Sequence, residues 1–556
     1  MDIEKAKILL ESLIGRIERD AGDGNWRLVG VISPQERDAL RFVLQYIGVE
    51  LGPDVHPAAS PKPIEAPAFL PEVSLNTHSA SLQTAEDQEV LMCIDFGTAM
   101  SKAFAIHAAD EVPIDLALGT RAGYTEAVYP VPSAVFISDN GRVFLGHEAI
   151  GRSLEDTTPG RERFDSPKQE LSQGTMADLA SVSVPTSINP SGVPLTKEDL
   201  ITLYLAYVTD LAGTELAERH HRSRHIRRRF ARPCWDAERT KWAEHQLKRM
   251  LARAQILADT FTGEWSGGID VRRVRAALNH LDAVVAPSFL VAEGVAEPVA
   301  AASSLVIRGE PQRRGFMVVD VGAGTTDFGM FVAVERAGLN GPRIFQVPGS
   351  IRGIRQAGDT IDRFLRATIL RAHNVDLQSA YGQRLSVELN LRVRQFKERL
   401  FRDGSLKYNL ADDTEGEITL EQFLEREEMA RFKSALEQEL RKTVESIDTT
   451  WLEGIFGKQG LMVVLTGGGS SLPMVQTLAK CTIESRGISM QCTASPQIPP
   501  WIAEGYRQFI PEYSQLAVAM GGASPTLPEM GPEIAHFGGG ITAPTYTAGN
   551  LQLKGT

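Results

Sequence analysis

Two apolar strands that each end in an aspartate and a turn of small residues constrain this chain more than any other feature. The segment "VLMCIDFGTAMSKAFAI" runs from Val90 to Ile106, and "GFMVVDVGAGTTDFGMF" covers residues 315–331. A buried carboxylate is costly unless a counter-charge lies beside it. Asp95 and Asp320 therefore predict a cation at each strand end, and their separation of about 225 residues indicates one site clamped between two lobes.

The small residues of these turns suit phosphate binding. Glycine lets backbone N–H groups approach a phosphate closely, and successive N–H groups form an anion-binding nest. The aspartates can hold Mg²⁺, mostly through water. A third segment, "LMVVLTGGGSSLPMVQTLA" (461–479), predicts a strand, a glycine turn and a helix that begins between Ser470 and Pro473, a geometry suited to a phosphate or a nucleotide sugar. The patterns GxxxxGK[ST] and GxGxxG with a ribose-binding acid are absent, which excludes P-loop and Rossmann sites.

Composition and patterning predict a globular α/β protein. Strand-like and helix-like segments alternate from about 89 to 523. The net charge of −12 argues against non-specific nucleic-acid binding, and four scattered cysteines favour a reduced, cytoplasmic setting. No uncharged apolar run is long enough for a membrane span. The basic stretch 218–233 could attract an acidic partner or nucleic acid, but we favour a solvated helix end that leads into a strand.

The sequence predicts four parts. Residues 1–51 predict an N-terminal helical module. Apolar residues recur at helical spacing over 3–19, and a capping box at Ser33 predicts the start of a second helix. These helices could dock on a partner or pack locally as a hairpin. Residues 52–88 are rich in Pro, Ala and Ser and predict a flexible linker. The main domain follows over 89–523, and the Gly/Pro-rich residues 524–556 read as a tail.

The order of the motifs resembles a known superfamily. DFGTAMSKA, AEPVAAA, VVDVGAGTTDFGMF and LTGGGSSLPMVQ follow one another as in the actin, heat-shock-protein-70 and sugar-kinase superfamily. The segments "FDSPKQEL" (164–171) and "QAGDTIDRFL" (356–365) make the chain most similar to the nucleotide-binding domain of heat-shock-protein-70 (DnaK-type) chaperones. The resemblance implies a two-lobed actin-like ATPase fold, with duplicated ribonuclease-H-like subdomains and two inserted upper subdomains. Lobe I would cover about 89–307, lobe II about 314–500, and a closing helix about 505–523.

The same resemblance implies a site for ATP or ADP with Mg²⁺. Asp95, Asp320 and Glu297 would hold Mg²⁺ through water. Lys168 would contact the terminal phosphate and orient the attacking water, and Thr325 would assist. Phosphoryl transfer to water of this kind depends on positioning and electrostatics. The other implied phosphate contacts are Gly97, Thr98, Ala99, Gly322, Ala323, Gly324 and Thr326, and Asp327 would support the second turn. Gly358 and Asp359 would lie near the ribose and phosphates, and Lys397, Gly467, Gly468 and Gly469 near the adenosine.

Several positions depart from the family pattern. Ser471 stands where the family has an adenine-stacking arginine, and the adenosine-pocket helix carries Arg394 and Glu398 instead of the family's glutamate and arginine. Ala99 and Ala323 replace a threonine and a glycine. The phosphate half of the implied site is therefore intact and the base half is altered. Only about 30 residues follow Ala523, so we expect no complete peptide-binding domain after it.

The leading functional hypothesis is a slowly hydrolysing, Mg²⁺-dependent ATPase that acts as a chaperone-like switch. It would signal its nucleotide state to a protein partner, which could dock through the N-terminal helices. Three alternatives stay open: an actin-like filament-forming ATPase, a small-molecule kinase on the same scaffold, and a nucleotide-binding scaffold without turnover.

Overall fold

The chain divides into two compact units, Met1–Glu65 and Ala66–Thr556. The computed structural model describes residues 17–19, 26–28 and 70–531, with gaps at 121–125, 157, 175–177, 306–313, 335–342 and 411–413.

In the first unit, β1 (Ile17–Arg19) pairs antiparallel with β2 (Trp26–Leu28). The predicted helix over 3–19 is therefore wrong at its last three residues. The segment "DAGDGN" between the two strands is made of turn-forming residues, which favour a reversal of the chain over a continued helix. The helix predicted after Ser33 lies outside the described residues.

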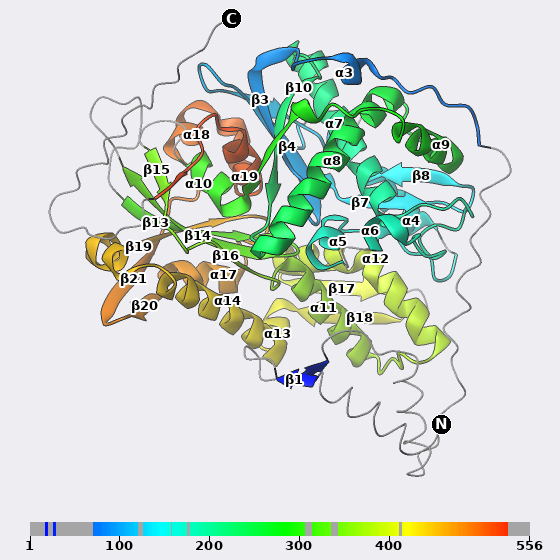
Figure 1. The fold of residues 1–556 in the computed structure, drawn as a ribbon. Coiled ribbons are helices and arrows are strands. Elements are labelled where there is room, and N and C mark those ends of the chain that lie inside the picture. The colour runs from blue at the N-terminus through cyan, green and yellow to red at the C-terminus, as the bar shows by residue number, and fades with distance from the viewer. Residues whose placement is uncertain are drawn as a thin grey trace, which may run out of the picture. The chain divides into compact units, whose positions relative to one another are not determined.

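The first large sheet of the second unit has the strand order β5–β4–β3–β10–β12, with β6 paired to β4 (Figure 1). Its first three strands in sequence form an antiparallel meander, and the last two run parallel to β3. The apolar run before Asp95 is buried, as expected for a central strand. The bounds are β3 Asp87–Asp95, β4 Met100–His107, β5 Val112–Leu116, β6 Val131–Pro132, β10 Ile226–Arg232 and β12 Val291–Ala296.

The second large sheet repeats this arrangement. Its central order is β15–β14–β13–β19–β21, in which β13, β14 and β15 form an antiparallel meander and β19 and β21 run parallel to β13. Strands β20 and β22 extend the two edges, and β16 pairs with β14. The bounds are β13 Arg314–Val321, β14 Thr326–Val334, β15 Arg343–Gln346, β16 Arg352–Ile354, β19 Leu461–Thr466, β20 Thr482–Ser485, β21 Ile488–Ala494 and β22 Glu529–Met530.

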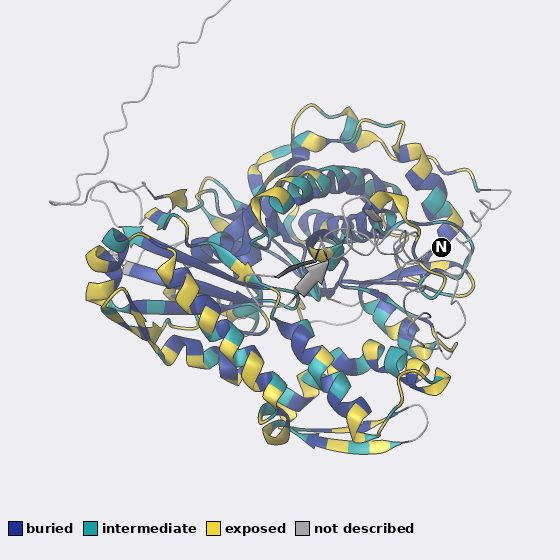
Figure 2. Cartoon of the chain, turned by 60° about the horizontal axis from the view of Figure 1, so that its bottom comes forward, coloured by how far each residue is buried: buried dark blue, intermediate teal, exposed yellow. Residues whose placement is uncertain are grey.

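The two sheets therefore carry the same strand order and the same directions. In each of them, the turn between the first two strands of the meander is one of the Asp-x-Gly turns singled out in the sequence. The predicted α/β class is confirmed, and the second unit contains two copies of one strand arrangement. Figure 2 shows the central strands of this unit almost wholly in the colour of buried residues.

Helices α10 (Glu297–Ser304) and α19 (Tyr513–Ala523) pack between the two sheets (Figure 1). One apolar cluster joins residues of both sheets, such as Phe104 and Phe331, to residues of both helices. The helices approach closely because both are built from small residues. A Cβ added to Gly521 would lie 2.7 Å from the Ser304 nitrogen and closer still to the Ala300 carbonyl oxygen. This contact joins the two halves of the unit.

Longer helices cover the outer faces and start at well-defined caps. Thr196 and Asp199 form a capping box at the start of α7, and Asp236 caps α8. Both helices belong to the same apolar cluster as the first sheet. No helix among the described residues is both long and apolar enough to cross a membrane. The bounds on this side are α3 His78–Ser81, α4 Gly146–Glu155, α5 Lys168–Gln173, α6 Asp178–Ser181, α7 Lys197–His220, α8 Ala237–Phe261 and α9 Val271–Leu281.

Two smaller sheets complete the described part of the second unit. Strands β11, β8, β7 and β9 form one beside α4, and β17 and β18 form a hairpin beside α12. The remaining bounds are β7 Ala134–Ile137, β8 Arg142–Leu145, β9 Phe164–Asp165, β11 Ile269–Asp270, β17 Ser405–Asn409, β18 Glu415–Thr419, α11 Gly358–Ala372, α12 Ala380–Asp403, α13 Leu420–Leu424, α14 Glu427–Glu445, α15 Thr449–Trp451, α16 Gly457–Gln459, α17 Pro473–Gln476, α18 Pro500–Gly505, and the short helices η1 Ser288–Leu290, η2 Leu452–Phe456, η3 Thr477–Lys480 and η4 Arg507–Glu512.

Two predicted boundaries are wrong. The linker predicted over 52–88 is ordered from residue 70 onward, because Leu70, Val73 and Leu75 pack on the core of the first sheet and helix α3 follows them. The tail predicted over 524–556 is wrong at its first residues, because Glu529 and Met530 form β22 and pair with β15. In both places a few apolar or extended residues find a partner on the domain, which composition alone does not reveal.

Candidate functional site

The two Asp-x-Gly turns meet. A Cβ added to Gly324, in the turn between β13 and β14, would lie 2.7 Å from the hydroxyl oxygen of Thr98, in the turn between β3 and β4. Next to this contact lies a cavity of about 450 Å³. Segments about 225 residues apart in the sequence thus form one site, as the spacing of Asp95 and Asp320 predicts.

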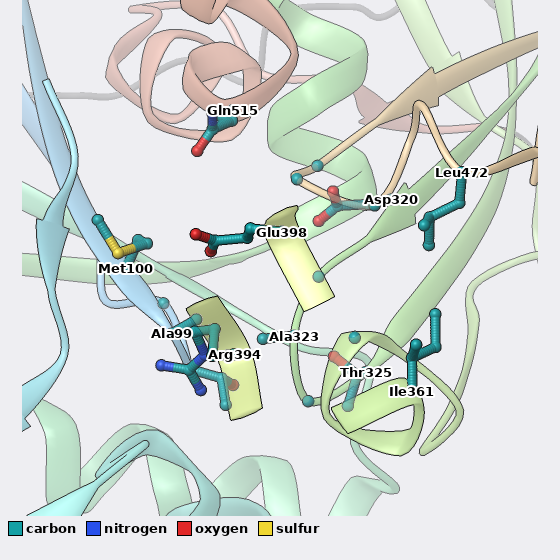
Figure 3. Close-up of a pocket in the computed structure, with 18 of the residues that line it drawn as sticks. Ala99, Met100, Asp320, Ala323, Thr325, Ile361, Arg394, Glu398, Leu472 and Gln515 are labelled. Carbon is teal, nitrogen blue, oxygen red and sulfur yellow. The ribbon is translucent and has the colours of Figure 1, made fainter. Parts of the chain in front are cut away.

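Most of the predicted site residues line this cavity (Figure 3). The two turns, the start of α10 and the start of α5 supply its charged end. The other walls come from α11, α12 and the glycine turn after β19. The predicted residues that line it are Asp95, Gly97, Thr98, Ala99, Lys168, Glu297, Asp320, Gly322, Ala323, Gly324, Thr325, Gly358, Lys397, Gly467, Gly468 and Gly469.

Three predicted residues lie elsewhere. Thr326 is fully buried and donates from its hydroxyl to the Gln356 carbonyl oxygen. Asp327 is also fully buried, and its carboxylate accepts from the Cys234 N–H at 2.7 Å and from the Thr325 hydroxyl at 2.7 Å. Asp327 therefore stabilises the conformation of the second turn without lining the cavity. Asp359 lines a neighbouring cavity of about 620 Å³, where its carboxylate accepts a hydrogen bond from Gln169.

Two ion pairs organise the charged end of the cavity. Lys102 donates to Asp95 at 2.9 Å, and strand register brings the pair together because the two residues are directly opposite each other in β3 and β4. Lys168 donates to Glu297, and both side chains are almost completely buried. Burial lowers the pKa of Lys168, but the charges of Glu297 and Asp95 outweigh it and leave that pKa raised, so the ammonium stays charged.

This end of the cavity has more buried carboxylates than the two lysines can neutralise. Burial raises the pKa of Asp320 well above its usual value, and the nearby charges of Glu297, Asp327 and Asp95 raise it further. Burial also raises the pKa of Glu297 to about 7, although Lys168 lies against it. Several buried carboxylates that repel one another are the arrangement expected where a divalent cation completes the charge balance.

The glycine turn after β19 is packed tightly against the second Asp-x-Gly turn. Gly467 has φ of +83°, and a Cβ there would lie 2.5 Å from the Asp320 carboxylate oxygen. No other residue type fits such a position without strain. The predicted helix begins at Pro473 but spans only four residues, so its dipole adds little.

Sequence reasoning missed two charged residues, Lys102 and Arg402, and the apolar wall. Lys102 could have been found from the register of the first hairpin. Ile361, Phe401 and Leu472 come from three different segments and carry no local signal. Figure 3 shows Ile361 and Leu472 on the side of the cavity away from Met100. The lining residues not predicted as contacts are Met100, Lys102, Ile361, Arg394, Glu398, Phe401, Arg402, Ser471, Leu472, Gln515 and Val518.

The residues fit a Mg²⁺–nucleotide. Aspartate and glutamate oxygens at the ends of β3, β12 and β13 are the hard ligands that Mg²⁺ prefers, directly or through water. Lys102 and Lys168 beside them supply positive charge for phosphates, and α12 adds the cations Lys397, Arg394 and Arg402 to the lining. Gly468 lines the cavity, and a Cβ there would meet no atom within 4 Å, which leaves backbone accessible.

The basic stretch 218–233 is largely engaged within the domain. Helix α7 ends at His220 and β10 begins at Ile226, as the favoured interpretation predicted. Arg228 is fully buried and donates to Gln255, Arg224 pairs with Asp210, and Arg232 pairs with Glu244.

Comparisons with known proteins assign no family to the chain. No protein-family model matches the sequence, and no curated protein matches it.

Proposed function

We propose that this chain binds ATP with Mg²⁺ and hydrolyses it slowly, as a switch with the actin-like ATPase fold of the heat-shock-protein-70 (DnaK-type) kind. One observation carries the proposal. Two Asp-x-Gly turns from equivalent positions of two sheets with the same strand order meet at one cavity, with Glu297 and Lys168 between them. Two such turns facing each other provide two phosphate-binding backbones and two carboxylates for one ligand.

The chain's own residues have separate tasks in this proposal. Mg²⁺, when bound, would neutralise phosphate charge at the carboxylates of Asp95 and Asp320. Lys168 is a buried cation whose position is fixed by Glu297, so it offers charge to a phosphate without further ordering. Glu297 lies at the start of α10, which packs on α19, so a change at its carboxylate is passed to the helix pair between the sheets.

The same geometry supports a switch. Asp95 ends a strand of the first sheet and Thr98 lies in the turn after it, whereas Asp320 and Thr325 lie at the end of β13 and in the turn of the second sheet. A ligand that contacts both turns stabilises the arrangement in which the turns meet, by its difference in affinity for the two arrangements. A protein partner that recognises one arrangement would then respond to the nucleotide state.

The residues at the proposed base-binding end of the cavity do not select adenine over guanine. Arg394, Glu398 and Ser471 replace the family's residues there and line the cavity. Ile361, Phe401 and Leu472 add an apolar wall, which a purine ring can cover. ATP and GTP must therefore be compared directly.

The test is steady-state turnover of ATP and GTP by the purified chain, with binding of both nucleotides measured by calorimetry. We expect Mg²⁺-dependent ATP hydrolysis that falls about 100-fold or more in Lys168→Ala and in Asp320→Asn, because each removes a charge positioned at the phosphates. Lys248→Ala and Asp282→Asn are matched controls, because Lys248 in α8 and Asp282 after α9 each form an ion pair with a partner and neither lines the cavity.

The outcomes separate the alternatives. Binding without turnover in the wild-type chain would leave a nucleotide-binding scaffold. ATP-dependent sedimentation would favour a filament former. Absence of nucleotide binding, with the two control variants behaving like wild type, would refute the proposal.

A further inference from the structure

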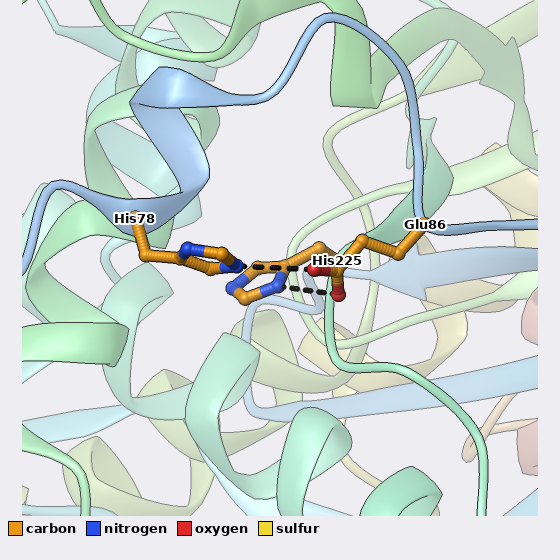
Figure 4. Close-up of side chains that lie close together, drawn as sticks. All are labelled: His78, Glu86 and His225. Carbon is orange, nitrogen blue, oxygen red and sulfur yellow. Dashed lines mark hydrogen bonds and ion pairs between the residues drawn. The ribbon is translucent and has the colours of Figure 1, made fainter.

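A second cluster of metal-ligating side chains lies at the opposite end of β3 from the cavity (Figure 4). His78 comes from α3, Glu86 directly precedes β3, and His225 directly precedes β10. One ligand atom from each residue lies within 4.8 Å of the other two. Strand β3 separates this cluster from Asp95 by nine residues, or about 30 Å of extended chain.

The contacts within the cluster bring two imidazoles and two carboxylates within hydrogen-bond distance of one another. Glu86 Oε1 lies 3.0 Å from His78 Nε2, and Glu86 Oε2 lies 2.9 Å from His225 Nδ1. Both oxygens of Asp259 lie 3.2 Å from the other ring nitrogen of His225, Nε2. A neutral imidazole has one N–H, and a carboxylate has none. If Asp259 accepts the N–H of Nε2, the lone pair of Nδ1 points at a carboxylate oxygen, and a cation between them satisfies both.

Asp259 has the position of an outer partner that orients a metal-binding histidine. Its side chain is 4% exposed, whereas that of His225 is 11% exposed. Gln255 donates to Asp259 at 2.9 Å and fixes the carboxylate from the preceding turn of α8. A histidine that binds a metal through one nitrogen usually donates its other N–H to such a carboxylate, which fixes the tautomer and the ring orientation.

The backbone also holds the ligands in place. Glu86 N–H donates to the His225 carbonyl oxygen at 3.0 Å, so these two ligands are tied to each other. Asn76 N–H donates to the Thr260 hydroxyl at 3.0 Å, and the Asn76 side chain accepts from the His78 N–H at 3.1 Å. The segment before β3 is thereby anchored to α8 next to Asp259.

We propose that His78, Glu86 and His225 form a Zn²⁺ site with Asp259 as the outer partner of His225. Two imidazoles and one carboxylate form the donor set of zinc sites that keep a fourth position for water, with Zn–N and Zn–O bonds of about 2.0–2.2 Å. Mg²⁺ and Ca²⁺ prefer all-oxygen ligands and do not suit this set. His78 and Glu86 are partly exposed, so solvent reaches the fourth position. Zinc here would fasten the segment that leads into β3 to the start of β10.

The test is calorimetric titration of the EDTA-treated full chain with ZnCl₂, followed by Co²⁺ substitution and visible absorption to detect tetrahedral coordination. We expect one tight site per chain. His78→Gln should weaken it at least tenfold, and Asp259→Asn should weaken it about 10- to 100-fold, because the outer partner no longer supports His225.

His107→Gln is the matched control. His107 also lies between two carboxylates, at 3.1 Å from Glu89 and 2.6 Å from Asp110, but the metal-ligating group found among the described residues does not include it. This variant should bind Zn²⁺ like wild type. Circular dichroism checks that the His78→Gln variant, altered at a half-exposed side chain, is folded.

The proposal is overturned if the wild-type chain takes up no Zn²⁺, if His78→Gln binds as tightly as wild type, or if His107→Gln loses affinity to the same degree. Because the readout is metal binding at the far end of β3, these results are independent of nucleotide turnover.

Discussion

At the scale of single residues, the cavity concentrates acidic side chains that the fold alone does not require. Asp95, Glu297 and Asp320 are each less than a tenth exposed and lie around one space. Buried ionisable groups with shifted pKa values are frequent at functional sites, where stability is given up for chemistry. Without metal or nucleotide, these buried carboxylates should lower the free energy of unfolding, and the size of this loss should depend on pH.

The first prediction concerns Asp320→Asn in EDTA. The folded-state pKa values of Asp320 and Glu297 are raised, the latter to about 7, above unfolded values of about 4. Above the unfolded values the folded state binds more protons than the unfolded state at both groups. The free energy of unfolding therefore falls as pH rises above about 4, and for Glu297 this fall continues to about pH 7. Removing the ionisable group should stabilise the protein by about 1–3 kcal/mol at pH 8 and by little at pH 4.

Thermal unfolding at the two pH values measures this effect. Asp282→Asn, at an exposed ion pair with Arg253, is the control and should change stability by no more than about 0.5 kcal/mol at either pH. An equal loss of stability in Asp320→Asn at both pH values would contradict the prediction.

At the scale of elements, α10 and α19 are the contact on which both sheets depend. Their approach requires glycine at position 521, because a Cβ there would overlap the Ala300 carbonyl oxygen and the backbone of Ser304. Overpacking against backbone is not relieved by a change of side-chain rotamer. The position is thus a sensitive probe of whether the two halves of the unit are held as described.

The second prediction follows from that contact. Gly521→Ala should lower the free energy of unfolding by about 1–3 kcal/mol or more. Gly151→Ala in α4 is the matched control: a Cβ there would meet nothing within 4 Å, and alanine in an exposed helix should stabilise by about 0.5–1 kcal/mol. Urea unfolding of both variants checks that the free energy of unfolding falls in one and rises in the other. If both variants shift stability in the same direction, the close approach of α10 and α19 is incorrect.

Local patterns in the sequence predicted the elements that follow local rules. The strand–Asp–Gly turns and the start of α17 at Pro473 are signalled by a few adjacent residues. The ordered segment from residue 70 was missed because its three apolar side chains have meaning only against the core that they cover. Lys102 was missed because its partner Asp95 is set by strand register. The zinc cluster was missed because His225 lies far along the sequence from His78 and Glu86.

At the scale of the whole molecule, the cavity and the zinc cluster both belong to the unit Ala66–Thr556. Its two sheets repeat one strand arrangement, and each contributes one turn to the cavity. A domain with its own hydrophobic core is expected to fold independently of the chain that precedes it. None of the residues described in the unit Met1–Glu65 lines the cavity.

The last prediction is that residues 66–556 alone fold and bind ATP with the affinity of the full chain. Every side chain proposed to contact nucleotide is retained, and the segment from Leu70 that packs on the core is retained with them. The comparison requires calorimetric ATP titration and thermal unfolding of the fragment and the full chain in the same buffer. Equal affinity with a changed rate of hydrolysis would assign the first unit a regulatory effect on turnover. A fragment that unfolds cooperatively but binds ATP more than tenfold more weakly would show instead that the first unit contributes to binding, because the cavity's own residues would then be insufficient.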